Sequence, residues 1–211
     1  MIDVYCISYT YPHTHQPVLV DFSVCFQPGM VTAIVGSNGC GKTTLSKLLV
    51  GLLRPDRGQI LIDGVDIAQL SLFQIGQKIG YIWQNPNRQL FSAIAMEEIA
   101  FGLRKQGLSP QQIQMKVDYW LNFFHLNHIK EALPLRLSLG EKQRLALAAV
   151  LSLDPPYLLL DEPTGGLDRR CRRELGELLG RLAKEQGRGV IVISHEADFL
   201  TQYAQREVSL I

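Results

Sequence analysis

The stretch GSNGCGKT, from Gly36 to Thr43, lies between two recognisable elements of secondary structure. Before it comes the short apolar run GMVTAIVG, which is typical of a buried strand. After it, in KTTLSKLLVGLL, leucines recur at helical spacing. The stretch fits the pattern G-x-x-x-x-G-K-[ST], in which glycines let backbone N–H groups surround phosphate oxygens at the start of a helix. The sequence therefore predicts a strand, a phosphate-binding loop and a helix, in this order.

The positions of this loop have different expected roles. Lys42 supplies a flexible positive charge for the outer phosphates of a nucleotide, and the Thr43 hydroxyl supplies a hard oxygen ligand for Mg²⁺. The full set of residues expected to contact the nucleotide here is Gly36, Ser37, Asn38, Gly39, Cys40, Gly41, Lys42, Thr43 and Thr44.

The run YLLLDE, from Tyr157 to Glu162, supplies two carboxylates that complement this loop. An apolar strand that ends in acidic residues places them at the carboxyl edge of the sheet, where open α/β sheets bind ligands. We expect Asp161 to hold Mg²⁺ through its water shell and Glu162 to orient the attacking water. The alternative is an acidic pair that caps a helix before PTGGLD.

The chain divides into three segments by pattern. Residues 1–83 read as strands around one helix. Residues 85–137 read as mainly helical, with Ser109, Pro110 and Gln112 forming a helix start. Strands and helices alternate again after residue 137, which predicts a largely parallel, layered sheet. One apolar stripe in the middle segment is interpreted as core and not as a cofactor contact: Ile113, Val117, Trp120, Leu121 and Phe124.

Composition limits the possible partners. The 211 residues carry 21 basic and 20 acidic side chains, a net charge of +1, which gives no reason to expect nucleic acid as a partner. The four cysteines lie far apart, as in a reduced cytosolic protein. The first residues read as a strand and not as a signal peptide, and no apolar run approaches the ~20 residues that span a bilayer. We therefore expect a soluble chain whose membrane role, if any, comes through a partner.

The stretch LSLGEKQR, from Leu137 to Arg144, allows two interpretations. In one, Ser138 is the N-cap of a helix and Glu141 reaches back to it as a capping box. In the other, Ser138 and the backbone amides face a phosphate. Both use the N–H groups that a helix start leaves unsatisfied, so the two interpretations are compatible.

The order of the motifs resembles that of the ATP-binding-cassette (ABC) ATPases. After the phosphate-binding loop come Gln84 at a strand end, a helical insertion, LSLGEKQR, YLLLDEP, GGLD and ISH, so the match covers essentially the whole chain. The resemblance implies an α/β fold of the P-loop NTPase type, with a mostly parallel layered sheet, an antiparallel β subdomain and a helical insertion. It implies a single domain over 1–211, with a nucleotide-binding core at 1–84 and 138–211 and a helical subdomain at 85–137.

The resemblance also implies roles for individual residues, with ATP and Mg²⁺ as cofactors. Tyr11 looks like the aromatic residue that stacks on adenine; Tyr9 is a weaker candidate, and both could simply be strand residues. Gln84 looks like the glutamine that touches Mg²⁺ and water and relays to the transport partner. His195 looks like the histidine that contacts the γ-phosphate, and Asp168 like the residue that joins two protomers.

In the family, LSLGEKQR corresponds to a helix start that faces the ATP of a second protomer. Ser138 and Gly140 match the common form, whereas Leu139 and Glu141 replace its Gly and Gln. The expected ATPase is therefore a head-to-tail dimer, with an identical or paralogous partner, in which this half-site is weakened but usable.

The run WQNPNRQLF, followed by AMEEIAFGL, resembles the ATPase subunits of energy-coupling-factor importers, which take up vitamins, cobalt or nickel. The implied partners are a transmembrane coupling protein and a substrate-binding membrane subunit, with this chain peripheral at the cytoplasmic face. Alternatively, Leu90, Phe91 and Phe101 merely pack the insertion. Two other functions stay open: an ABC ATPase in DNA repair or on the ribosome, and a P-loop kinase acting on a small molecule.

Overall fold

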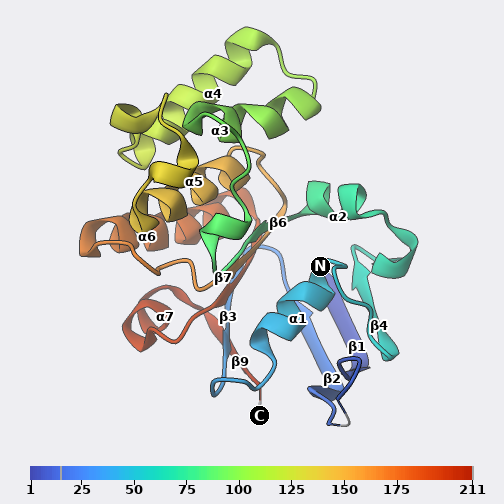
Figure 1. The fold of residues 1–211 in the computed structure, drawn as a ribbon. Helices are drawn as coiled ribbons and strands as arrows, with labels where there is room; N and C mark the ends of the chain where they lie inside the picture. The colour runs from blue at the N-terminus through green and yellow to red at the C-terminus, as the bar shows by residue number, and fades with distance from the viewer. Residues whose placement is uncertain (15, 211) are drawn as a thin grey trace. The chain divides into compact units, whose positions relative to one another are not determined.

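The strands form two sheets that differ in direction, in a computed structural model that describes residues 1–14 and 16–210 (Figure 1). An antiparallel sheet has the order β2-β1-β4-β5 and a second, mainly parallel sheet has the order β6-β7-β8-β3-β9. The predicted combination of a parallel layered sheet and an antiparallel β subdomain is therefore confirmed. The strands are β1 (Ile2–Tyr9), β2 (Leu19–Phe26), β3 (Val31–Val35), β4 (Arg57–Ile62), β5 (Val65–Asp66), β6 (Ile79–Ile82), β7 (Tyr157–Asp161), β8 (Gly189–Ile193) and β9 (Arg206–Ser209).

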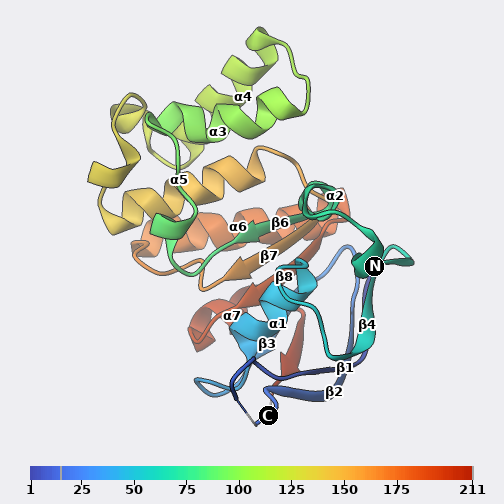
Figure 2. The ribbon, with the colours of Figure 1, turned by 45° about the vertical axis from the view of Figure 1, so that its right-hand side comes forward.

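The chain splits into two compact units, and the first carries most of the strands. It comprises Met1–Tyr81, Pro156–Asp161 and Gly176–Ile211. Its helix α1 (Lys42–Leu49) lies between the two sheets, because one hydrophobic core contains its leucines and buried side chains of both sheets (Figure 2). The helix ends before Gly51, whose φ of 71° is in the left-handed region that favours glycine. Two shorter helices, α2 (Leu72–Lys78) and α7 (Ala197–Tyr203), belong to the same unit.

The second unit comprises Ile82–Pro155 and Glu162–Leu175 and is mainly helical. The predicted helix start at Ser109 is confirmed, because its side chain and that of Gln112 form a reciprocal capping box with Pro110 in the first turn. Most of the predicted apolar stripe is buried, whereas Ile113 is half-buried. The helices are α3 (Ala95–Lys105), α4 (Pro110–Phe123), α5 (Leu139–Leu151) and the first turns of α6 (Arg169–Gln186), which continues into the first unit.

The boundary between these units differs from the expected subdomain boundary. Residues 138–155 and 162–175 group with the helical insertion and not with the strands. The reason is that α5 is buried on several sides and contacts α3 and α4 within this unit. The functional division into a nucleotide-binding core and a helical subdomain stays a prediction.

A polar cluster around Asp63 ties the turn between β4 and β5 to the start of β7. Asp63 accepts hydrogen bonds from the Met1 amine at 2.8 Å, from the Tyr157 hydroxyl at 2.7 Å and from the Lys78 ammonium at 3.1 Å. Burial alone would raise the pKa of Asp63, but these hydrogen bonds outweigh it and lower the pKa from 3.8 to about 2. Burial and the bond to Asp63 raise the pKa of Tyr157. The cluster therefore contains an ionised carboxylate that joins both sheets.

In residues 1–14 and 16–210, none of the helices is both long and apolar enough to cross a bilayer.

Candidate nucleotide site

The register of the parallel sheet aligns the ends of three strands. Ile193 of β8 pairs with Ile34 of β3 on one side and with Asp161 of β7 on the other. The loop that starts at Gly36 and the segment that contains His195 therefore leave the sheet at the same edge as the Asp161 carboxylate. This is the carboxyl edge, where open α/β sheets bind ligands.

The predicted phosphate-binding loop closes around the Lys42 side chain. The Lys42 ammonium donates to the carbonyl oxygens of Gly36 at 2.8 Å and Ser37 at 2.9 Å. A Cβ at Gly36 would lie 2.5 Å from the Leu210 carbonyl oxygen, so the backbone passes where a larger residue would clash. Gly41 starts α1 at φ 102° and has no side chain that caps the helix, so the first N–H groups remain available to an anion. This cradle fits the phosphates of a nucleotide.

A network of hydroxyl groups lies at the start of α1, beside the expected Mg²⁺ ligand Thr43. The Ser46 hydroxyl donates to the Thr43 carbonyl at 2.9 Å and lies 2.9 Å from the Tyr81 hydroxyl. Burial raises the pKa of Tyr81 to about 12, the bond to Ser46 opposes this, and the negative charge of Asp161 adds to it. Asp161 is buried, and because its charge acts on Tyr81 it lies within electrostatic reach of this network. Sequence patterns did not identify Ser46 and Tyr81, since their pairing depends on the fold.

Of the two tyrosines considered for adenine, burial favours Tyr11. Tyr9 is buried in the core, whereas Tyr11 is only half-buried. The Tyr11 hydroxyl lies 3.1 Å from the Thr44 hydroxyl, and the two tyrosine rings meet edge to face with centroids 5.0 Å apart. Tyr11 is thus fixed to the first turn of α1.

The remaining predicted site residues belong to the second unit, whose first residue after β7 is Glu162. Glu162 has a φ of 51°, in a region that non-glycine residues seldom occupy, and its carbonyl accepts a hydrogen bond from the Gly165 amide at 3.3 Å. Gln84 is exposed between β6 and a short helical turn, Pro86–Arg88. The Lys142 ammonium of α5 reaches that turn and donates to Asn87 at 2.8 Å.

The start of α5 is a capping box with an ionised carboxylate. The Glu141 amide donates to the Ser138 hydroxyl oxygen at 3.3 Å. In return, Glu141 accepts from the Ser138 amide at 2.9 Å and from the Ser138 hydroxyl at 2.6 Å. The Ser138 hydroxyl and amide are the main causes that lower the pKa of Glu141, and His128, 3.1 Å from its other oxygen, adds to them. The capping interpretation is confirmed, and it uses the one hydroxyl proton of Ser138. Leu139 is 56% exposed at the first position of the helix.

A buried carboxylate that sequence patterns did not identify shapes the loop after Gln84. Glu98 is buried and accepts hydrogen bonds from the amides of Phe91 and Ser92. The side chains of Phe91 and Phe101 are 67% and 44% exposed, and their rings meet edge to face at 5.0 Å. These two phenylalanines therefore do not merely fill the interior of the insertion.

Comparison with known proteins identifies the family of the chain. Residues 19–165 match the family described as ABC transporter. An ABC transporter ATP-binding protein of Pyrococcus furiosus is 38% identical over 210 residues, which cover 100% of this chain and 80% of that protein. The energy-coupling factor transporter ATP-binding protein EcfA2 of Methanospirillum hungatei is 36% identical over 208 residues, 98% of this chain and 52% of that protein.

Solved structures give the same result. The chain resembles cbiO1 from Clostridium perfringens, part of the ABC transporter complex cbiONQ, with 34% identity and a TM-score of 0.84 over 99% of this chain and 84% of that one. It also resembles the dimeric ATP-binding cassette MJ0796 bound to ADP and Pi, with 25% identity and a TM-score of 0.90 over 100% and 94% of the two chains. The chain therefore belongs to the ABC transporter family, as an ATP-binding subunit that couples ATP hydrolysis to transport.

Proposed function

We propose that this chain is the ATPase subunit of an energy-coupling-factor type importer that takes up a vitamin or a transition-metal ion. The observation that carries the proposal is the similarity to an energy-coupling factor ATPase over 98% of the chain. The similarity to a subunit of cbiONQ supports it. The transported molecule would be selected by the membrane subunits.

In this proposal, the chain holds ATP by its phosphates and orients one water. The loop Gly36–Thr44 binds the phosphates, and Tyr11 stacks on adenine. Thr43, Asp161 and Gln84 would hold Mg²⁺, which would neutralise part of the phosphate charge. Glu162 accepts a hydrogen bond from the water and aims it, while His195 donates to the γ-phosphate.

The proposed partners meet this chain on two different surfaces. A second ATPase protomer, identical or paralogous, faces Ser138, Gly140 and Asp168 and encloses the ATP of its partner site. A transmembrane coupling protein contacts Gln84 and the loop after it, where exposed Phe91 and Phe101 offer apolar surface. The chain would then work as a peripheral subunit at the cytoplasmic face of the membrane, with a substrate-binding membrane subunit in the complex.

The first test of this function is sedimentation of the Glu162→Gln variant with and without MgATP. The variant should bind ATP but not hydrolyse it, so the closed dimer should accumulate, either as two copies of this chain or with the second ATPase of the complex. Hydrolysis at the normal rate would show that another residue positions the water. The importer assignment is tested by co-purification of the tagged chain with membrane subunits. ATP-driven uptake by those membrane subunits in the absence of this chain would contradict the assignment.

A further inference from the structure

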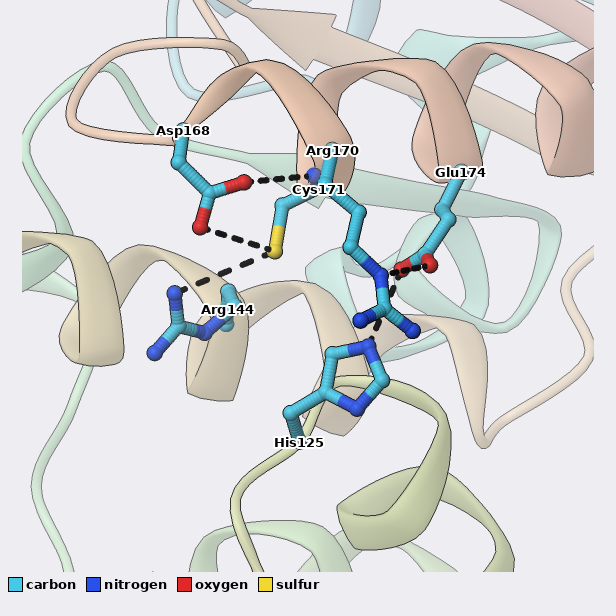
Figure 3. Close-up of polar contacts among 6 residues, drawn as sticks. All are labelled: His125, Arg144, Asp168, Arg170, Cys171 and Glu174. Atoms are coloured by element: carbon cyan, nitrogen blue, oxygen red, sulfur yellow. Dashed lines mark hydrogen bonds and ion pairs between the residues drawn. The ribbon is translucent and has the colours of Figure 1, made fainter.

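Asp168 uses its two carboxylate oxygens for different contacts (Figure 3). One oxygen, Oδ1, accepts a hydrogen bond from the Cys171 amide at 2.8 Å and thereby caps the start of α6. The other oxygen, Oδ2, accepts from the Cys171 thiol at 3.7 Å. The bond from the Cys171 amide is sufficient to cap the helix. The additional bond from the Cys171 thiol fixes the orientation of the Asp168 carboxylate.

The thiol of Cys171 also connects Asp168 to α5. A nitrogen of the Arg144 guanidinium donates to the Cys171 sulfur at 3.9 Å. A guanidinium can only donate and a carboxylate can only accept, whereas a thiol does both, so the direction of both contacts is fixed. Cys171 is buried, and burial, followed by the charge of Asp168, raises the pKa of its thiol. The thiol therefore keeps the proton that it donates to Asp168.

Two more contacts join the same helix to the loop before Asp168. The Gln143 side chain is buried and donates to the Pro163 carbonyl at 3.3 Å. Gly140 lies so close to Gly166 that a Cβ at Gly140 would come within 2.5 Å of the Gly166 carbonyl oxygen. Gly140, Gln143 and Arg144 are spaced so that they lie on one face of the first turns of α5. The loop from Pro163 to Asp168 packs against this face of α5.

We propose that Arg144 is a positioning residue for Asp168 and acts through the Cys171 thiol, so that the Asp168 carboxylate is held in one place relative to the start of α5. The role of Asp168 at a second protomer rests on the proposed function, whereas the contacts themselves lie within one chain. The consequence is that Ser138 and Asp168 reach the second protomer together, as two parts of one rigid surface.

The direct test is the pKa of the Asp168 carboxyl group, measured by carbon NMR on the full chain with labelled aspartate. The amide of Cys171 is the largest cause that lowers this pKa, and the Cys171 thiol and the charge of Arg144 contribute as well. Arg144→Gln and Cys171→Ala should each raise it. Arg144→Lys, which keeps the charge, and Cys171→Ser, which keeps a donor, should restore it towards the parent value.

The matched control is Arg170→Gln. Arg170 precedes Cys171 on the same helix, but its guanidinium donates to Glu174 at 2.8 Å, and Glu174 also contacts His125 at 3.1 Å, so this group forms its own network (Figure 3). The Arg170 charge also interacts with Asp168, but its main partner is Glu174, so its loss should raise the Asp168 pKa less than Arg144→Gln does. An equal rise of the Asp168 pKa in Arg144→Gln and Arg170→Gln would overturn the proposal, because the loss of any nearby positive charge would then explain the rise.

The second readout is MgATP-dependent association in the Glu162→Gln background. Arg144→Gln and Cys171→Ala should weaken it about five- to tenfold, as expected for the loss of a hydrogen bond, while ATP affinity at the chain's own phosphate-binding loop stays the same. Association equal to the parent in both variants would overturn the positioning role. If the parent associates neither with itself nor with the second ATPase of the complex, the proposed function fails, and the Asp168 pKa still tests the positioning role.

Discussion

The Glu141→Gln variant should strengthen ATP-dependent association of the ATPase and at the same time slightly destabilise the chain. Two other capping boxes show that glutamine serves equally well at this position of a helix. Gln112 accepts from the Ser109 amide at 2.9 Å and its own amide donates to Ser109 at 3.3 Å, the same distances as for Glu141 and Ser138. Gln74 and Ser71 repeat this geometry. The variant should therefore keep the helix start.

The magnitude follows from the charge that is removed. The Ser138 hydroxyl now donates to a carboxylate at 2.6 Å, and a bond to a charged acceptor is about 1 kcal/mol stronger than one to a neutral amide. A phosphate oxygen that accepts from this hydroxyl at about 2.7 Å would lie roughly 5 Å from the Glu141 carboxylate, since the hydroxyl is 2.6 Å from that carboxylate. The resulting repulsion is about 1–3 kcal/mol per charge, reduced by the solvent exposure of the site. A net gain of about 2 kcal/mol corresponds to roughly 30-fold tighter association.

Stability should change in the opposite direction. A negative charge in the first turn of a helix stabilises it by about 0.3–1 kcal/mol, so the variant should lose about this free energy of unfolding. The assay combines urea unfolding with sedimentation of the Glu162→Gln background over a range of MgATP concentrations, with the second ATPase present if the chain does not self-associate. Adding Leu139→Gly should increase association further, since Leu139 is exposed at the same helix start.

The matched control is Gln112→Glu, which places a charge in a capping box that no predicted nucleotide contact uses. It should leave association unchanged. The reasoning is refuted if Glu141→Gln lowers stability as expected but leaves association unchanged, or if turnover of the assembled complex is the same with Leu139→Gly and Glu141→Gln combined.

Three further predictions concern the first unit. Lys42→Ala should abolish nucleotide binding and turnover with the thermal transition retained, and normal turnover would contradict the loop assignment. Alkylation of Cys40 should be slower with MgATP, and equal rates would place this thiol outside the site. Tyr157→Phe should lower the free energy of unfolding by about 1 kcal/mol at pH 7, measured by urea titration, because Asp63 loses one hydrogen bond. Since the pKa of Asp63 falls from 3.8 to about 2 on folding, its contribution is complete above about pH 5 and is lost as the pH falls through 2. The whole pKa shift of Asp63 corresponds to about 2.4 kcal/mol of free energy of unfolding, but the Asp63 side chain is 42% exposed. The parent chain should therefore lose about 1 kcal/mol of this free energy on acidification, measured by urea titration at several pH values.

The parts of the fold that sequence patterns predicted are those that depend on neighbouring residues. The strand before Gly36, the strand that ends at Asp161, and the capped helices at Ser109 and Ser138 all follow from local spacing and composition. Each is determined within about ten residues, so the pattern and the structure agree.

What sequence patterns could not predict depends on residues far apart in the chain. The bond between Ser46 and Tyr81 and the three hydrogen bonds that Asp63 accepts from Met1, Lys78 and Tyr157 arise only when the strands and helices are assembled. The grouping of α5 with α3 and α4 is a similar case, because the face that α5 buries cannot be read from its sequence alone. The glycine at position 51 also ended α1 earlier than the leucine spacing suggested.

The alignment of Ile34, Ile193 and Asp161 across three strands has a consequence for how the chain can change in length. One residue inserted in β8 would turn every following side chain to the opposite face and move His195 about 3.3 Å along the sheet. The turn at Gly107, between α3 and α4, is different, because the space around it is open and no strand register depends on it. Insertions and deletions among relatives should therefore collect at turns such as this one, while β3, β7 and β8 keep their lengths.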